Sequence, residues 1–263
     1  MEKQLRVSFK TPMRLLTVCR SYRRPKALRT LLQSWDETHS KGSEIIVYLS
    51  TDDPKLHNYE NVIAGRNVII DDHRFFGDSI NHVTQNIFPK IPYYQGIGDD
   101  HVYHTHGWDS LMIGAIEKET AGWGMAASND LVEKDWYAMR HPSGEVYPWR
   151  LAEHLNGMYP PSHSQYGADI YFEILLYSIG LLVFVKDAVI EHNCWAATGK
   201  GENDENQKYS YSQEARNSFL SWFRPWRETQ MPADKARLKE IVDTERAKRT
   251  VETDENSSDN PSA

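Results

Sequence analysis

The sequence of 263 residues contains only two cysteines, Cys19 and Cys194, and it has no long hydrophobic run. Two cysteines cannot form the disulfide framework that stabilises many small secreted domains. No apolar stretch approaches the roughly 18 residues that a membrane-spanning helix needs. The first residues also lack the apolar segment that is typical of a secretory signal peptide. These absences predict a soluble cytoplasmic protein with no membrane partner.

Positive charge is also in deficit, because 30 lysines and arginines stand against 37 aspartates and glutamates, which gives a net charge of −7. This balance argues against a protein whose main task is to coat nucleic acid. The tail, residues 250–263, has four acidic side chains and no basic one. We expect this tail to be disordered, because it has too few apolar side chains to compensate the entropy of ordering. Basic residues gather between Arg20 and Arg29, which allows a local anion site.

The rest of the composition is ordinary for a globular protein, with 40% hydrophobic and 25% charged residues. Buried-strand patterns alternate with helical spacing along the chain, which predicts an α/β fold with a mostly parallel central sheet flanked by helices. The expected strands are 14–19, 44–50, 67–70, 93–98, 122–128, 181–185 and 188–192. One expected helix begins at Pro25, and four others cover 78–88, 108–120, 167–180 and 232–248. We predict one domain over residues 1–225, a helical extension over 226–249, and a polar, mobile stretch at 202–218.

Acidic residues follow three of the expected strands, at Asp52–Asp53, Asp71–Asp72 and Asp99–Asp100. Ligands of open α/β sheets bind at the carboxyl edge of the strands, so the sequence predicts an acidic site there. The run Gly98-Asp99-Asp100-His101 is the strongest candidate for a metal site. Carboxylates bind hard divalent cations, and histidine suits metals such as Mn²⁺. A plain turn is an equally good interpretation of this run when it is taken alone.

Other candidate residues each have a structural alternative. His192 follows a short apolar strand and is either a surface histidine or a metal ligand brought in by the fold. Asp169 opens an expected helix and is either its cap or a general base. Asp52 and Asp53 suit a turn or the contacts of a nucleoside. The basic loop 20–24 is either a solvated surface or a diphosphate contact.

These motifs in this order resemble those of the GT-A glycosyltransferases. The matching runs are Arg-Arg-Pro after the first strand, TDDP after the second, GDDHVYHTHGWDSLM around the fourth, and the later GADIYF and VIEHNCW. Such enzymes use nucleotide-sugar donors and have a Rossmann-like α/β domain. The nearer resemblance is to family-2-type glycosyltransferases of actinobacterial phages, and it covers about residues 12–200.

The resemblance implies a metal centre. Asp99, Asp100 and His101 would occupy the DxD motif, which in this family binds the divalent metal and the ribose and phosphates of the donor. The implied metal ligands are Asp99, His101 and His192, and the implied ions are Mn²⁺ and Mg²⁺. The third place of the motif is histidine rather than aspartate here, a departure that affects the choice of metal.

The resemblance also implies a donor and a base. Asp52 or Asp53 would lie beside the nucleoside, and Arg24 would lie near the opening of the donor site. Asp169 would remove the proton of the acceptor hydroxyl, although alanine precedes it where the family has an acidic residue. The implied reaction is inverting sugar transfer from a nucleotide-sugar, in particular a UDP-sugar. Aromatic residues in 130–166 would hold the acceptor or belong to the core.

Several functions stay open at this point. A nucleotidyltransferase or phosphohydrolase would need a similar acidic metal site, and a non-catalytic sugar-nucleotide-binding module would need the same donor contacts. The QxxRW-type motif of membrane synthases is missing, which disfavours a processive polysaccharide synthase. The candidate acceptors are a hydroxymethylated pyrimidine of phage DNA, a glycan and a protein hydroxyl. With the DNA acceptor, the enzyme would modify phage DNA in the host cytoplasm.

Overall fold

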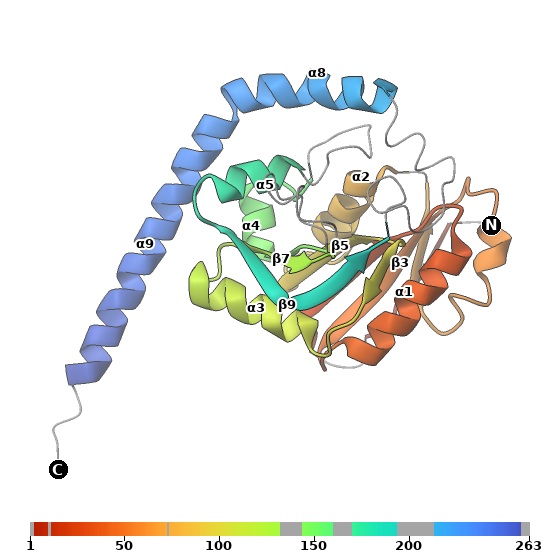
Figure 1. Cartoon of the computed structure of the whole chain (residues 1–263), viewed down its shortest axis with the longest axis horizontal. Helices are drawn as coiled ribbons and strands as arrows, with labels where there is room; N and C mark the ends of the chain where they lie inside the picture. Colours follow the sequence, from red (N-terminus) through yellow and green to blue (C-terminus); the bar gives the residue numbers. More distant parts are fainter. Residues whose placement is uncertain are drawn as a thin grey trace, which may run out of the picture.

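Helices cover both faces of a central sheet in the computed structural model of the protein (Figure 1). The described residues are 3–9, 12–72, 74–131, 144–159, 170–193 and 213–258. Within them the sheet has nine strands in the order β1-β4-β3-β2-β5-β8-β7-β9-β6. None of the helices in these ranges is both long and apolar enough to cross a lipid bilayer.

The elements alternate between strand and helix for most of the chain. The strands are β1 (Gln4–Arg6), β2 (Leu15–Arg20), β3 (Ser43–Ser50), β4 (Asn67–Asp71), β5 (Tyr93–Gly98), β6 (His101–Tyr103), β7 (Met125–Asn129), β8 (Val146–Pro148) and β9 (Leu182–His192). The helices are α1 (Pro25–Thr38), the 3₁₀-helix η1 (Leu56–Tyr59), α2 (Phe76–Asn81), the π-helix η2 (His82–Ile87), α3 (Trp108–Glu119), α4 (Trp149–His154), α5 (Ile170–Tyr177), α8 (Gln213–Thr229) and α9 (Met231–Ser258).

Four strands, β2 to β5, form a parallel unit at the centre of one half of the sheet. β2 pairs in parallel with β3 and with β5, and β3 pairs in parallel with β4. Every residue of β2 is buried, as expected for a strand with helices on both faces. The register places Arg20 opposite both Tyr48 and Gly98, so the carboxyl ends of three strands meet at one edge. The strands expected from the apolar runs are confirmed here.

One face of the sheet is covered by α1 and α3. Pro25 occupies the first turn of α1, where its missing N–H costs no hydrogen bond. The helix then buries the stripe of side chains that its spacing predicted: Leu28, Leu31, Leu32 and Trp35. Trp108 and Met112 of α3 join the same apolar cluster. This layer anchors the sheet from the side opposite to α2.

The other face is covered by α2, α4, α5 and the two C-terminal helices. Apolar side chains of all five belong to one cluster, which includes Ile80, Leu151, Leu175, Phe223 and Leu238. Phe219 and Trp226 of α8 also bury their rings there, because they share one side of the helix. In Figure 1 the later part of α9 extends away from the sheet, and Val242 is its last buried residue within the described side chains.

Several expectations need correction. The sheet is mixed rather than mostly parallel, because β1, β8 and β6 pair antiparallel with their neighbours. The two short strands expected near residues 181–192 are one strand, β9, whose register against β7 shifts after Ser128. The helix expected over 78–88 begins at Phe76 and changes to a π-helix at His82. Such a change of period is invisible in the apolar spacing.

The C-terminal part also differs from the sequence pattern. α8 begins at Gln213, inside the stretch that we expected to be mobile, and residues 202–212 lie outside the described part of the chain. α9 continues to Ser258, into the tail for which we expected disorder. A helix that is already nucleated by packing elsewhere can continue through residues of modest helix propensity. The domain boundaries at 225 and 249 stay predictions.

Candidate metal and nucleotide site

The antiparallel pair of β6 and β9, called here the β6–β9 pair, brings together residues that are far apart in the sequence. Its register places His101 directly opposite His192. Next to this pair, the backbone N–H of Asn193 donates to the carbonyl oxygen of Asp100 at 2.7 Å, and the N–H of His192 donates to Asp130 at 3.0 Å. The turn after β5 and the end of β9 are thus held together by backbone bonds, independently of any ligand.

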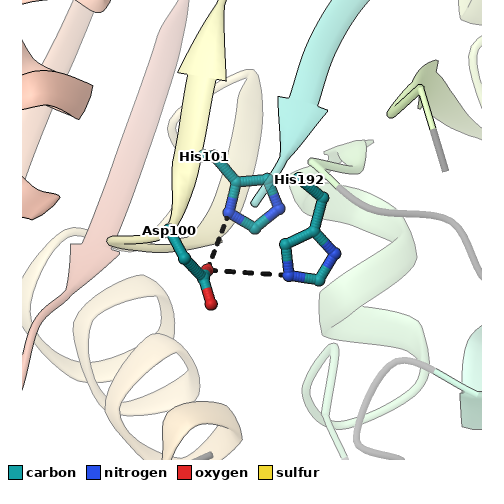
Figure 2. A group of neighbouring side chains, drawn as sticks. All are labelled: Asp100, His101 and His192. Carbon is teal, nitrogen blue, oxygen red and sulfur yellow. Dashed lines mark ion pairs between the residues drawn. The ribbon is translucent and has the colours of Figure 1, made fainter. Parts of the chain in front are cut away.

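The side chains of Asp100, His101 and His192 face a common space (Figure 2). Oδ1 of Asp100 lies 3.3 Å from Nδ1 of His101 and 3.6 Å from Nε2 of His192. The two imidazole rings stack, with centroids 4.3 Å apart and planes at 6°. The three potential ligand atoms all lie within 4.8 Å of one another. This is a cluster of two imidazoles and one carboxylate at the carboxyl edge of the sheet.

Burial sets the charge state of this cluster. His101 is buried, Asp100 is mostly buried, and the side chain of His192 is 26% exposed. Burial and the neighbouring His192 lower the pKa of His101, although Asp100 opposes the shift. Burial alone would raise the pKa of Asp100, but His192 and His101 hold it well below its usual range. A neutral imidazole beside an ionised carboxylate is the state that a metal ion requires.

The cluster fits a divalent cation by the chemistry of its donors. Nδ1 of His101 lies 3.1 Å from the carbonyl oxygen of Gly98. A proton on Nδ1 would donate to that oxygen and leave the lone pair on Nε2, the arrangement usual for metal-binding histidines. Two nitrogen donors and one oxygen donor suit Mn²⁺, Fe²⁺, Co²⁺ or Zn²⁺ better than Mg²⁺, which prefers oxygen.

Asp99 stands apart from this cluster. Its carboxylate accepts a hydrogen bond from the Ser21 hydroxyl at 2.5 Å, and Nη1 of Arg24 lies 3.3 Å away. The same Arg24 nitrogen lies 3.2 Å from Oδ2 of Asp100, so Arg24 bridges the two carboxylates. Burial raises the pKa of Asp99, against the pull of Arg24 and Ser21. The geometric cluster therefore contains Asp100 where the resemblance implied Asp99. Arg24 is buried beside both carboxylates, and its place near the opening of a donor site stays a prediction.

Asp52 and Asp53 follow β3 at the same edge but make local contacts. Both oxygens of Asp53 accept backbone hydrogen bonds, from Arg23 at 2.6 Å and from Lys55 at 2.8 Å. Asp53 thus ties the loop after β2 to the loop after β3. Asp52 accepts from the Ser50 hydroxyl at 2.5 Å. Neither contact tests a nucleoside role, which stays a prediction.

The base predicted from the resemblance, Asp169, lies outside the described residues. The first described residue of the helix that follows is Ile170. Asp109, the acidic residue of the GWD run, accepts hydrogen bonds from Ser40 and Ser43 at the beginning of β3. It therefore lies at the opposite edge of the sheet, where it supports the fold.

The aromatic residues expected to hold the acceptor divide into two groups. Residues 132–143, with Trp136 and Tyr137, lie outside the described part of the chain. Tyr159 is buried, and its ring packs against Phe76 at 5.3 Å in an edge-on contact. Tyr159 thus belongs to the core.

Sequence reasoning missed two residues that build the site. Ser21 joins Asp99 to the hydroxyl of Tyr59, and that hydroxyl also accepts the backbone N–H of Arg24 at 2.8 Å. Tyr59 belongs to the short helix η1, for which the apolar spacing gives no signal. For Ser21, the available sign was a polar residue that follows Arg20 directly at the end of an expected strand.

Comparisons with known proteins show which solved structures share this fold. Neither a protein-family model nor a curated protein matches the chain. Among solved structures, it is similar to the mannosyltransferase PcManGT from Pyrobaculum calidifontis in complex with GDP-Man and Mn²⁺. That match has a TM-score of 0.54 and 13% identity, and it covers 89% of this chain and 79% of that chain.

Two further solved structures agree. Glucosyl-3-phosphoglycerate synthase from Mycobacterium tuberculosis, with Mn²⁺, UDP and phosphoglyceric acid, matches at a TM-score of 0.53 and 13% identity, over 80% of this chain and 78% of that chain. S. aureus TarS with UDP matches at a TM-score of 0.51 and 11% identity, over 81% and 73%. The chain therefore has the fold of GT-A glycosyltransferases; a specific likeness to phage enzymes is not among these findings.

Proposed function

We propose that the protein is a metal-dependent glycosyltransferase that moves a sugar from a nucleotide-sugar to an acceptor hydroxyl. The observation that carries this proposal is the cluster of Asp100, His101 and His192, which lies at the carboxyl edge of a sheet with the GT-A fold. In open α/β sheets this edge is the place where ligands bind. The neighbouring Arg24 adds a buried cation beside the same carboxylates.

Asp100, His101 and His192 would hold the metal. When bound, a divalent ion supplies Lewis-acid stabilisation of the negative charge that develops on the leaving nucleoside diphosphate. Arg24 orients the carboxylate of Asp100 through Oδ2, which leaves Oδ1 facing both imidazoles. Asp99 supports Arg24 from the other side through Oδ1. In this assignment Asp99 is a positioning residue, and Asp100 replaces it as a metal ligand.

The proposed donor is a UDP-sugar. Its nucleoside would lie over the loops after β2 and β3, which Asp53 ties together. The UDP complexes of two structural neighbours and the GDP-Man complex of a third support a nucleoside diphosphate at this edge. Mn²⁺ in two of these complexes supports a metal-dependent site.

The proposed transfer is inverting, with Asp169 as the base. The acceptor oxygen attacks the anomeric carbon as the bond from that carbon to the β-phosphate oxygen breaks. The acceptor proton passes to the carboxylate of Asp169, and the nucleoside diphosphate leaves with the bonding electron pair. The candidate acceptors are a hydroxymethylated pyrimidine in DNA, a glycan and a protein hydroxyl, and the turnover experiment below compares them.

Donor binding tests the proposal first. UDP, UDP-glucose, UDP-N-acetylglucosamine and GDP-mannose are compared by thermal shift, with and without Mn²⁺. A ligand that binds only the folded state stabilises it by mass action, about 2.7 kcal/mol at a hundredfold excess over Kd. We expect UDP and one UDP-sugar to raise Tm only when Mn²⁺ is present. An unchanged Tm with every nucleotide contradicts the proposal.

Turnover then separates the alternatives. A labelled donor that passed the binding test is incubated with oligonucleotides that contain 5-hydroxymethylcytosine, with oligosaccharides and with a serine-containing peptide. Asp169→Asn should lower transfer by about 10²–10⁴-fold with donor affinity unchanged. NMR of the product should show an inverted anomeric carbon. Hydrolysis of nucleoside triphosphates without sugar transfer would favour a phosphohydrolase, and tight donor binding without any turnover would favour a binding module.

A further inference from the structure

Arg20 is a buried cation that forms no ion pair with any residue the structure describes. It is the last residue of β2, between the carboxyl ends of β3 and β5, and only 7% of it is exposed. Its Nε donates to the backbone carbonyl of Arg74 at 2.9 Å. No carboxylate lies within ion-pair distance of its guanidinium in the described part of the chain, and its buried Nη2 has no hydrogen-bond partner there.

This state is costly for the protein alone. A buried charge is normally paired, and an unpaired guanidinium N–H loses its hydration without compensation. The nearest compensation is the ring of Tyr22, whose centroid lies 5.5 Å from the guanidinium carbon. The charges that act on Arg20 from the packed elements are those of Asp99 and Asp52, both at the same edge of the sheet. They balance its charge at a distance without satisfying Nη2.

Arg74 shares one feature with Arg20, a buried nitrogen without a hydrogen bond to any described residue, although it does have an ion pair. Its Nε is also buried and lacks a hydrogen-bond partner within the described residues, while its Nη2 lies 3.6 Å from Asp71. Arg74 lines an open surface hollow of about 350 Å³ whose other walls are polar side chains and Phe75. Arg20 does not line this hollow itself, but its Nε hydrogen bond to the backbone carbonyl of Arg74 ties it to a residue that does.

We propose that Arg20 binds an anionic oxygen of a substrate, a phosphate or carboxylate oxygen delivered to the carboxyl edge of the sheet. The guanidinium fits such oxygens because its planar N–H groups form short, charge-assisted hydrogen bonds. The inference rests on the proposed function, since it adds an anion contact to the same site. The anion belongs either to the diphosphate of the donor or to an acidic acceptor.

Calorimetry with a ligand series tests the donor as the source. Uridine, UMP and UDP are titrated into Mn²⁺-loaded wild type and Arg20→Gln, which keeps an N–H for the Arg74 carbonyl but no charge. For a donor phosphate, Arg20→Gln should bind UDP about 10–100-fold more weakly and uridine equally well. Arg20→Lys should recover part of the affinity, and Arg224→Gln, an exposed arginine of α8, should change nothing.

A second titration tests the acceptor as the source. Inorganic phosphate is added to the protein saturated with Mn²⁺ and UDP, and binding that depends on Arg20 assigns the anion to the acceptor. Arg20→Gln with unchanged affinity for UDP and for phosphate overturns the proposal, provided that its Mn²⁺ affinity and Tm show a folded site. If wild type fails to bind UDP, the donor proposal fails, while phosphate binding to the free protein still tests Arg20.

Discussion

The parallel unit and the β6–β9 pair divide stability and chemistry between them. Strands β2 to β5 are buried on both faces by helices, and most of their side chains are apolar. The β6–β9 pair is only partly buried and carries two of the three candidate metal ligands at its end. The comparison indicates that the parallel unit supplies most of the buried apolar core, whereas the less buried β6–β9 pair supplies most of the candidate metal ligands. Substitutions should therefore change stability and metal binding separately.

The largest expected effect is on the parallel unit's apolar layer. Leu31 of α1 is fully buried in the cluster below the sheet. Leu31→Ala should lower the free energy of unfolding by about 2–5 kcal/mol, because it leaves a cavity. Urea unfolding measures this, with Leu111→Ala, a 42% exposed leucine of α3, as the control near zero. If stability and metal binding depend on different regions, Mn²⁺ affinity should stay unchanged in the folded Leu31→Ala protein. A tenfold loss of affinity would contradict that separation.

The next effect concerns a close approach between α2 and the core. A Cβ on Gly77 would lie 2.6 Å from Cβ of Tyr159. Gly77→Ala should therefore destabilise the protein by about 1–3 kcal/mol through overpacking. Gly114→Ala is the matched control, since no atom lies within 4 Å of the new methyl group and α3 should gain up to about 1 kcal/mol. Equal stabilities of the two variants would show that Tyr159 moves freely.

The β6–β9 pair should respond in the opposite way. His192→Ala should weaken Mn²⁺ binding by about 10–100-fold or more, while stability without metal should fall less than in Leu31→Ala, because the ring is 26% exposed. Calorimetry measures the affinity, and His57→Ala, an exposed histidine of η1, is the control. Unchanged Mn²⁺ affinity in His192→Ala would show that His192 of β9 is not a metal ligand.

The smallest effect is expected at the chain's end. Val242 is the last buried residue of α9 among the described side chains. Truncation after Arg249 should change the free energy of unfolding by less than about 0.5 kcal/mol. Leu238→Ala, at a fully buried position of the same helix, should cost about 2–5 kcal/mol. A truncation that lowers Tm by several degrees would show that the tail packs on the protein.

The sequence predicted the parallel unit because its signals are local. Apolar runs define β2, β3, β4 and β5, and the leucine spacing after Pro25 defines α1. The acidic turns after these strands could also be placed, since parallel strands bring their carboxyl ends to one edge. The resemblance of the motifs to GT-A glycosyltransferases then predicted the fold that the solved structures confirm.

The site could be predicted only in part, because it depends on register. His101 and His192 meet through the pairing of β6 with β9, and a shift of one residue would turn one ring to the other face. The different surroundings of Asp99 and Asp100 follow from the turn after β5, where one carboxylate meets Ser21 and the other meets the histidines. The spacing of residues in the sequence predicts neither this pairing nor the different surroundings of the two aspartates.

Mn²⁺ calorimetry on Asp99→Asn and Asp100→Asn tests the central claim most directly. The two residues are adjacent and both contact Arg24, so the variants form a matched pair. The account predicts that Asp100→Asn loses more than about 100-fold in Mn²⁺ affinity, because a ligand is removed, while Asp99→Asn stays within about tenfold of wild type. A large loss in Asp99→Asn with nearly normal binding in Asp100→Asn would contradict the assignment of the metal centre.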